Sequence, residues 1–326
     1  MVTKHNMPPY PFSIPHNFGG LQPKISSFKN ARFVVLPVPY DMTASYQSGT
    51  RNGPRAIIDA STHMELYDEE LDKEACKAGI HTLPYLEPTS KGPEEMAGIV
   101  YDASRHIINA KKIPVMLGGE HSITFGLVKA LKKKYPNMSV LQMDAHADMR
   151  DVYQESPYNH ACIARRISEI CPIVQVGIRS LSVEEAEFLK KGSRAGTHRG
   201  THPKDGSDGW GVKGQGKTHH GISTYFAKDI INDIPAKDIC NNLTDDVFVT
   251  IDLDVFDPSI MPATGTPEPG GLGWYDVIEL LKFIANKKNI IGFDVVELCP
   301  IPGNVAPDFM SAKLVYKMMG YIVKKQ

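Results

Sequence analysis

The sequence lacks the features of a secreted, membrane-spanning or nucleic-acid-binding protein. Its 326 residues include five cysteines, scattered without the close pairs of a zinc ribbon, and no apolar run long enough to span a bilayer. The amino terminus is polar and proline-rich and has no apolar segment of signal-peptide type. A formal net charge of -1 gives no bulk attraction to nucleic acid or to an anionic membrane. We therefore expect a cytoplasmic protein with reduced, buried cysteines and with no nucleic-acid or membrane partner.

Short β-branched or apolar runs alternate with helical patterns along most of the chain. The runs predict strands at 33–37, 80–83, 113–117, 140–144, 173–176, 222–225, 247–251 and 290–296. The helical patterns lie between most of them, at roughly 55–63, 95–110, 123–134, 160–170, 183–191, 274–286 and 308–323. Continuous apolar strands separated by helices indicate an α/β fold, in which a largely parallel sheet of about eight strands is covered by helices on both faces.

Three residues mark where predicted helices begin. Pro54 follows Gly53 and suits the first turn of a helix, because proline needs no hydrogen-bond partner for its nitrogen there. Ser122 and Ser182 are candidate amino caps, since a serine hydroxyl can accept from the free N–H groups of a first turn.

One stretch interrupts the alternation of strands and helices. Residues 192–221 contain nine glycines and four histidines but few apolar side chains. Such a composition buries too little surface to offset the entropy of ordering. We interpret the stretch as a surface insertion inside one domain of residues 1–326. Its histidines are interpreted as solvated loop residues: His198, His202, His219 and His220.

Two acidic clusters and one histidine form the most informative pattern in the chain. Alternate side chains of an extended strand share a face, so Asp-x-His-x-Asp directs three ligands one way and Asp-x-Asp directs two more. All of them follow predicted strands, and ligands of open α/β sheets gather beyond the carboxyl ends of the strands. The six candidate metal ligands are His121, Asp144, His146, Asp148, Asp252 and Asp254.

Four carboxylates and two imidazoles, without sulfur, favour hard cations such as Mn²⁺ or Mg²⁺. Two divalent ions would balance the four negative charges, and Asp144 and Asp252 are the natural bridging ligands because each comes first in its motif. A pair of such ions turns a shared water into a nucleophile near neutral pH. An ordinary strand-end turn explains an isolated Asp-x-Asp, but it explains the combined pattern poorly.

These motifs resemble those of the ureohydrolases, the family of arginase and agmatinase. The resemblance rests on Gly118-Gly-Glu-His-Ser122, Met143-Asp-Ala-His-Ala-Asp148 and Thr250-Ile-Asp-Leu-Asp-Val-Phe-Asp-Pro258, followed by 263–271 and 294–298. It implies an arginase-like three-layer fold and a hydrolase with two Mn²⁺ per chain that releases urea from a guanidino group. It also implies a homo-oligomer, a trimer or a hexamer.

The resemblance further implies a role for each site residue. One metal would bind His121, Asp144, Asp148 and Asp252, and the other Asp144, His146, Asp252 and Asp254. Asp148 would also accept a hydrogen bond from the nucleophile. Two more residues would act on the substrate: His160 would shuttle protons near the leaving amine, and Glu297 would pair with the guanidinium. A polar residue at the start of helix 160–170 is the competing interpretation of His160, and a strand-end acid that of Glu297.

Agmatine is the expected substrate, giving putrescine and urea. Arginase-like sequences have an asparagine where this chain has Arg150, and Asp148-Met-Arg-Asp151 looks more like agmatinase. Residues 43–56 also resemble an agmatinase segment, although a turn and a helix start explain them about equally well.

Several alternatives remain open. Guanidinobutyrate, guanidine or arginine could be the substrate, because loops that bind the substrate's tail vary within the fold. A metal-dependent deacetylase of the same fold would hold one zinc and release acetate. A protein that binds metal or a guanidino compound without turnover is the third possibility.

Overall fold

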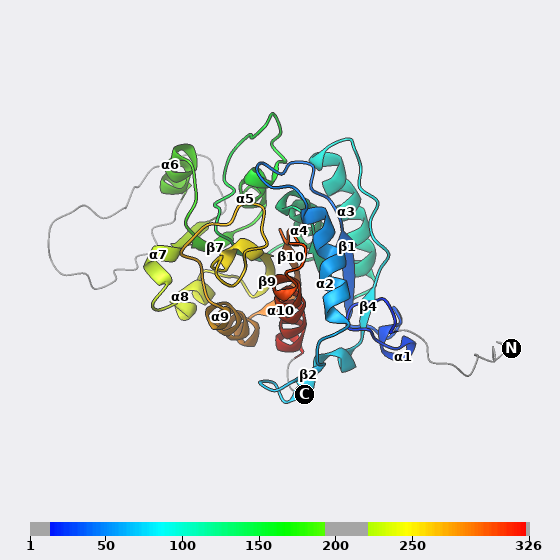
Figure 1. Cartoon of the computed structure of the whole chain (residues 1–326). Coiled ribbons are helices and arrows are strands. Elements are labelled where there is room, and N and C mark those ends of the chain that lie inside the picture. The colour runs from blue at the N-terminus through cyan, green and yellow to red at the C-terminus, as the bar shows by residue number, and fades with distance from the viewer. Residues whose placement is uncertain (1–13, 193–220, 324–326) are drawn as a thin grey trace, which may run out of the picture.

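The computed structural model describes residues 14–192 and 221–323 (Figure 1). In these residues a parallel sheet of eight strands has the order β4-β1-β5-β10-β9-β6-β7-β8. Its strands are β1 (Phe33–Val38), β4 (Ile80–Thr82), β5 (Ile113–Gly118), β6 (Ser139–Met143), β7 (Ile173–Ile178), β8 (Ile222–Phe226), β9 (Asp246–Asp252) and β10 (Asn289–Val296). Each of the eight predicted strands is confirmed, with small shifts at the ends.

Helices cover both faces of the sheet and complete three layers. One layer contains α2 (Gly53–Ser61), α7 (Ala227–Ile230), α8 (Ala236–Asn241), α9 (Trp274–Lys287) and α10 (Ala306–Ile322). The other contains α3 (Pro93–Asn109), α4 (Thr124–Lys134), α5 (Ile163–Ser168) and α6 (Val183–Gly192). The predicted α/β class and the predicted cover on both faces are therefore confirmed.

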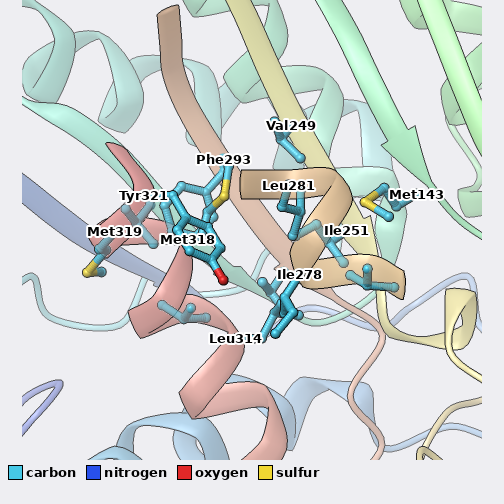
Figure 2. Close-up of a cluster of buried hydrophobic side chains, with 14 of the residues drawn as sticks. Met143, Val249, Ile251, Ile278, Leu281, Phe293, Leu314, Met318, Met319 and Tyr321 are labelled. Carbon is cyan, nitrogen blue, oxygen red and sulfur yellow. The ribbon is translucent and has the colours of Figure 1, made fainter. Parts of the chain in front are cut away.

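The core explains why the strands are continuously apolar. In β1, Val34 and Leu36 pack against the α3 and α4 layer, whereas Phe33 and Val35 pack against the α2 and α10 layer. Figure 2 shows part of the cluster on the α2 and α10 side of the sheet, in which side chains from β9, β10 and the helices α9 and α10 meet. Because successive residues of a strand face opposite layers and both layers are apolar, every position favours a hydrophobic side chain.

Short elements were not predicted from the sequence. These are α1 (Pro23–Ser26), α7, α8 and a hairpin of β2 (Tyr67–Asp68) and β3 (Lys73–Glu74). The predicted helix at 160–170 is a 3-10 turn over His160–Cys162 followed by α5, and the Asn159 side chain caps it by accepting from the backbone of Ala161. Elements of two to six residues are too short to show a hydrophobic period.

The predicted helix starts were right at two positions and wrong at one. Pro54 lies in the first turn of α2, and the Ser182 hydroxyl accepts from the backbone nitrogen of Glu185 at 3.3 Å, as an amino cap does. Ser122 does not cap α4, because it lies inside the 3-10 turn His121–Ile123 that precedes this helix, and Ile123 stands at the cap position. The Ser122 hydroxyl donates to the Glu120 carboxylate.

All five cysteines are buried and free, as expected. Among the described residues, no helix is both long and apolar enough to cross a membrane. Residues 193–220 of the predicted insertion, with its four histidines, lie outside the described residues.

Gly119 allows the loop after β5 to lie directly against the backbone of Tyr40. A Cβ atom at this position would lie 2.0 Å from the Tyr40 carbonyl oxygen. The next residue, Glu120, donates its backbone N–H to that same carbonyl at 2.8 Å. The loop that carries Glu120 and His121 therefore depends on a glycine here.

We expect Gly119→Ala to lower the free energy of unfolding by about 1–3 kcal/mol, the usual effect of overpacking a close contact. Gly98→Ala is the matched control, because Gly98 lies on the exposed side of α3 with open space around it. That change should raise stability by about 0.5–1 kcal/mol, since alanine favours a helix. Denaturant unfolding of both variants measures the difference, and equal effects would contradict the close contact.

Candidate metal centre

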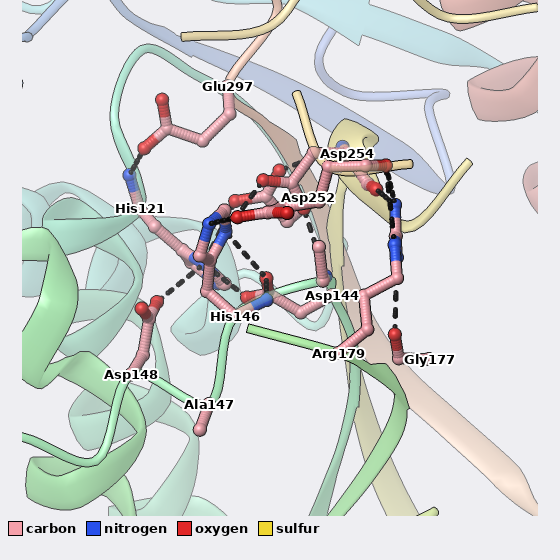
Figure 3. A network of polar contacts seen from close by, with 12 residues as sticks. His121, Asp144, His146, Ala147, Asp148, Gly177, Arg179, Asp252, Asp254 and Glu297 are labelled. Atoms are coloured by element: carbon pink, nitrogen blue, oxygen red, sulfur yellow. Dashed lines mark hydrogen bonds and ion pairs between the residues drawn. The ribbon is translucent and has the colours of Figure 1, made fainter. Parts of the chain in front are cut away.

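Four neighbouring strands at the middle of the sheet end at one edge, and a predicted site residue follows or ends each of them. In the strand order β5-β10-β9-β6, these residues are His121, Glu297, Asp252 and Asp144. This edge is formed by the carboxyl ends of parallel strands, where open α/β sheets bind their ligands. Figure 3 shows the side chains turned toward one another from these separate loops.

The first group of candidate ligands surrounds one nitrogen of His121. The Nδ1 atom lies 3.2 Å from Asp144 Oδ2, 3.4 Å from Asp148 Oδ2 and 3.4 Å from Asp252 Oδ2. All four side chains are buried. Nδ1 has no hydrogen-bond partner with acceptable geometry among the described residues, so its lone pair is available to a cation at the centre of the carboxylates.

The second group lies beside the first and shares Asp144 with it. Ligand atoms of Asp144, His146 and Asp254 lie within 4.8 Å of one another. His146 Nδ1 is 2.8 Å from Asp254 Oδ2 and 3.8 Å from Asp144 Oδ1 (Figure 3). Asp144 therefore belongs to both groups, which is the arrangement that a bridging ligand requires.

Burial makes this cluster of acids unfavourable without positive charge. It raises the pKa of Asp144, raises that of Asp148 to about 7 and holds that of Asp252 well above its usual range. Burial would lower the pKa of His146, but the Asp254 and Asp144 carboxylates raise it to about 11. The cluster thus draws in protons where cations are missing, because like charges in a buried space cannot all remain ionised.

The residues present fit two hard divalent cations. Four carboxylates and two imidazoles offer oxygen and nitrogen donors without thiolate, and Nδ1 of His121 has no hydrogen-bond partner in the part of the chain that the structure describes. Asp252 belongs to the first group only, and its Oδ1 accepts from the backbone of Asp254 at 3.0 Å. Its expected contribution to the second metal stays a prediction.

Residues outside the two groups orient the ligands. The Nε2 atom of His121 lies 2.8 Å from the Thr250 hydroxyl, which fixes the ring and leaves Nδ1 for the carboxylate side. Gln142 donates to Asp144 Oδ2 at 2.8 Å and is itself held by Gln175 at 2.9 Å. These hydrogen bonds occupy one nitrogen of His121 and one oxygen of Asp144. The remaining lone pairs of both residues are then available to the centre of the site.

Arg179 fastens the loop after β9 to the end of β7. Its guanidinium donates to the carbonyl oxygen of Asp254 at 2.6 Å (Figure 3). It also donates to the carbonyl oxygens of Glu268 at 2.8 Å and Pro269 at 3.1 Å. A planar fork of five N–H donors can serve several carbonyls at once, which lysine cannot. Arg179 therefore positions the backbone that carries Asp254.

The two residues expected to act on the substrate line a cavity above the metal groups. Glu297 and His160 both border it, together with His121, Asp148 and Asp252. Glu297 accepts from the backbone nitrogen of His121 at 2.6 Å, and burial and nearby carboxylates hold its pKa well above the usual range. Burial lowers the pKa of His160 to about 4, so its ring is neutral at pH 7.

Two of the residues that line the cavity have strained backbones. Asp148 has a φ angle of +52° and Glu297 a φ angle of +67°, in the left-handed region that favours glycine. Non-glycine residues keep such angles only where the surrounding structure enforces them, and this happens most often at functional sites. The backbone is thus bent to turn both carboxylates toward the cavity.

Residues 43–56 contribute to the cavity as well as to a helix start. Residues 44–47 line the cavity, and Gly53 opens α2. The turn and the helix start are therefore confirmed, whereas the substrate role of the segment stays a prediction. Arg150 also lines the cavity, where its guanidinium lies 3.8 Å from Glu185 and stacks on Tyr153.

The sequence patterns did not single out Glu120, Thr43, Thr250 and Arg179 as site residues. Glu120 is the third residue of the Gly-Gly-Glu-His-Ser motif, so its position beside His121 was the available signal. Burial raises the pKa of Glu120 to about 7, and hydrogen bonds from Ser122 and Thr43 oppose that rise. Thr43 begins the segment 43–56, which was the available signal for it, but Arg179 gave none, because its partners lie far away in the sequence.

The fold and the site define a three-layer α/β protein with a candidate two-metal centre at the carboxyl edge of a parallel sheet. The family model described as the arginase family matches residues 31–207 and 211–320. The chain belongs to the arginase family.

Individual relatives agree with this assignment. The chain is 37% identical to an N(1)-aminopropylagmatine ureohydrolase of Synechocystis sp., with 91% of each chain covered. It is 34% identical to an agmatinase of Pyrococcus horikoshii, with 90% of this chain and 92% of that one covered. Its fold is similar to the crystal structure of an agmatine ureohydrolase of Thermoplasma volcanium, with a TM-score of 0.77, 28% identity and 95% of each chain covered.

We expect Asp252→Asn to weaken divalent metal binding more than roughly 100-fold, because a direct ligand outweighs the 10–100-fold effect of an outer partner. Metal analysis after dialysis against Mn²⁺ measures this, and Mn²⁺ should raise the unfolding temperature of the wild type but hardly that of the variant. Asp151→Asn is the control, since Asp151 is exposed and pairs with Arg166. Equal metal content in all three proteins would contradict the candidate centre.

Thr250→Val should lower metal affinity by about 10–100-fold, because it removes the partner of His121 Nε2 while keeping the side chain's shape. Thr250→Ser retains the hydroxyl and should bind metal nearly as well as the wild type. Calorimetric titration with Mn²⁺ compares the three. An equal loss in both variants would mean that packing of the threonine methyl group, rather than the hydrogen bond, orients the ring.

Proposed function

We propose that this chain is a metal-dependent ureohydrolase that hydrolyses the guanidino group of an amine to urea and a shorter amine, with two Mn²⁺ per chain. The observation that carries this proposal is the convergence of six candidate metal ligands, four of which line one cavity together with Glu297 and His160. Agmatine is the substrate we propose first, giving putrescine. The cytoplasmic location and the trimeric or hexameric assembly stay predictions from the sequence.

Charge supports a cationic substrate. Two divalent cations would neutralise Asp144, Asp148, Asp252 and Asp254, so Glu297 would remain as an unmatched acid in the cavity. Guanidinium carries its charge at every physiological pH and presents a planar row of N–H donors. A carboxylate accepts two of these donors side by side, which aims the central carbon.

The chain's own residues supply the remaining chemistry. The cations, when bound, activate a water molecule as the nucleophile. Asp148 accepts a hydrogen bond from that water, and Glu297 holds the guanidinium in place. His160 carries a proton to the departing nitrogen, because an unprotonated amide anion is a very poor leaving group.

A second substrate, N(1)-aminopropylagmatine, is favoured by one specific observation. The Synechocystis relative that is 37% identical carries that name, whereas the Pyrococcus agmatinase is 34% identical. Both compounds present the same guanidino group and differ in the length of the cationic tail. The part of the cavity that residues 44–47 line would have to accommodate that tail.

The other candidates have less support. A deacetylase of this fold would use one metal, whereas the two ligand groups here share Asp144. Arginine and guanidinobutyrate carry a carboxylate, which needs a basic side chain of the protein as its partner. The Arg150 guanidinium at this cavity instead faces Glu185 and stacks on Tyr153. A protein that binds without turnover would not need a neutral His160 bordering the cavity.

Urea release with Mn²⁺ should be fastest with agmatine or N(1)-aminopropylagmatine and much slower with arginine, guanidinobutyrate or guanidine. A colorimetric urea assay over this panel measures the order, and acetate release from acetylated amines tests the deacetylase. Urea from arginine alone would reject the proposed substrates and retain the ureohydrolase. No urea from any compound would reject the enzyme activity itself.

Glu297→Gln should lower kcat/KM for the best substrate by roughly 30-fold or more, because losing one charge of a buried pair costs about 2–5 kcal/mol. The amide oxygen can still accept from the His121 backbone, so the loop keeps its anchor. Glu187→Gln is the control, since Glu187 is an exposed acid on α6. Steady-state kinetics compare them, and an unchanged kcat/KM in Glu297→Gln would exclude the guanidinium contact.

A further inference from the structure

A buried carboxylate lies next to the metal centre and belongs to neither ligand group. Glu120 is 1% exposed and precedes His121 in the chain. Its oxygens accept from the Thr43 backbone nitrogen at 2.6 Å, from the Thr43 hydroxyl at 2.8 Å and from the Ser122 hydroxyl. All three donors are satisfied together when Glu120 is an ionised carboxylate, which only accepts.

The Thr43 hydroxyl connects this carboxylate to His160. Its oxygen accepts from the His160 backbone nitrogen at 3.1 Å and lies 3.0 Å from His160 Nδ1. A hydroxyl has one proton, and here that proton is donated to Glu120. The contact with Nδ1 can then be a hydrogen bond only if Nδ1 carries the proton and donates it to Thr43.

The state of the second ring nitrogen follows from the first. A neutral imidazole has one protonated and one bare nitrogen, so protonation of Nδ1 leaves the lone pair on Nε2. Nε2 lies 3.5 Å from the Ser45 hydroxyl, and Ser45 lines the cavity beside His160. The proton-accepting nitrogen of His160 is therefore on the Ser45 side of the ring, at the wall of the cavity.

We propose that Thr43 and Glu120 are positioning residues that fix the tautomer and the orientation of His160, so that bare Nε2 serves the proton transfers of the reaction. The role of His160 in that reaction belongs to the proposed function, on which this inference rests. The hydrogen bonds themselves stand independently of any activity.

The same contacts assign a role to two sequence features that patterns alone left unassigned. Thr43 begins the segment 43–56, which was explained equally well as a turn and as a substrate element. Glu120 comes from the Gly-Gly-Glu-His-Ser motif, 77 residues away from Thr43 in the chain. The fold brings both to His160, which is 117 residues from Thr43, so the link exists only in the folded chain.

A purely structural role is the competing explanation. The two bonds between Thr43 and Glu120 could serve only to hold the loop around residue 43. A structural role would change stability when it is removed, but it would leave the tautomer of His160 and the pH dependence of turnover unaltered. These readouts separate the two explanations.

Thr43→Val removes the hydroxyl and keeps the shape of the side chain, whereas Thr43→Ser keeps the hydroxyl. Thr50→Val is the matched control: Thr50 lies in the same segment, is 1% exposed, and has a hydroxyl without a hydrogen-bond partner among the described residues. With the Mn²⁺-loaded protein and the best guanidino substrate, Thr43→Val should lower kcat roughly 10- to 100-fold, which does not exceed the lower end of the 10²–10⁴-fold that proton transfer contributes. KM should change less than about threefold, because no substrate contact is lost.

Two further results are expected from these variants. Thr43→Ser should restore most of kcat, and Thr50→Val should match the wild type. The pH profile of kcat should change shape in Thr43→Val only, since the two tautomers of His160 exchange protons at different nitrogens. Unchanged kcat and an unchanged profile in a folded Thr43→Val protein would overturn the proposal.

A spectroscopic measurement on the wild-type protein decides the question without turnover. Protonated and bare ring nitrogens of histidine have well separated ¹⁵N shifts. In the wild-type protein labelled with ¹⁵N-histidine and loaded with Mg²⁺, which is diamagnetic, the His160 spectrum should show protonated Nδ1 and bare Nε2. A protein with His160→Gln assigns the signals. Protonated Nε2 in the wild type would overturn the inference.

The two proposals fail in different ways. A wild-type protein that releases no urea from any guanidino compound contradicts the ureohydrolase, while the His160 tautomer remains measurable. A wild-type protein that is active but has the opposite tautomer contradicts only the role of Thr43 and Glu120.

Discussion

Mutual repulsion of four buried aspartates is the constraint on which the rest of this structure depends. Asp144, Asp148, Asp252 and Asp254 converge within a small volume where burial raises the pKa of three of them. A fold cannot hold so many like charges together unless cations or protons balance them. The central strands, the outer hydrogen bonds and the strained loops are all arranged around that requirement.

The surroundings of the centre are as specific as the ligands. Thr250 fixes the His121 ring, Gln142 holds Asp144, and Arg179 holds the backbone of Asp254. Each contact restricts the rotation of the ligand side chain or of the backbone that carries it. A similar arrangement exists on the substrate side, where Thr43 connects the Glu120 carboxylate with His160. The candidate metal ligands and His160 thus share one principle, in which a buried polar partner restricts a side chain to one orientation.

The backbone is strained at two residues of the site. Asp148 and Glu297 keep positive φ angles that ordinary residues avoid, at a cost of about 1–3 kcal/mol each. The apolar layers on both sides of the sheet stabilise the fold against that loss, since nearly every residue of the central strands is buried. The strands β5, β6, β9 and β10 therefore connect the core with the site. Most of their side chains are apolar and buried, and polar site residues lie at or just after their carboxyl ends.

The sequence alone determined the eight strands, the long helices and the six candidate ligands, because hydrophobic periodicity and the spacing of Asp-x-His-x-Asp are local properties. It did not determine the short helices and the hairpin, for which two to six residues carry no period, or the role of Ser122, which lies in a 3-10 turn and donates to Glu120. The tertiary structure alone decided that β5, β10, β9 and β6 are neighbours, since strand order depends on crossovers between distant segments. It also decided the partners of His121 and His160, because Thr250 and Thr43 approach them only when the chain has folded.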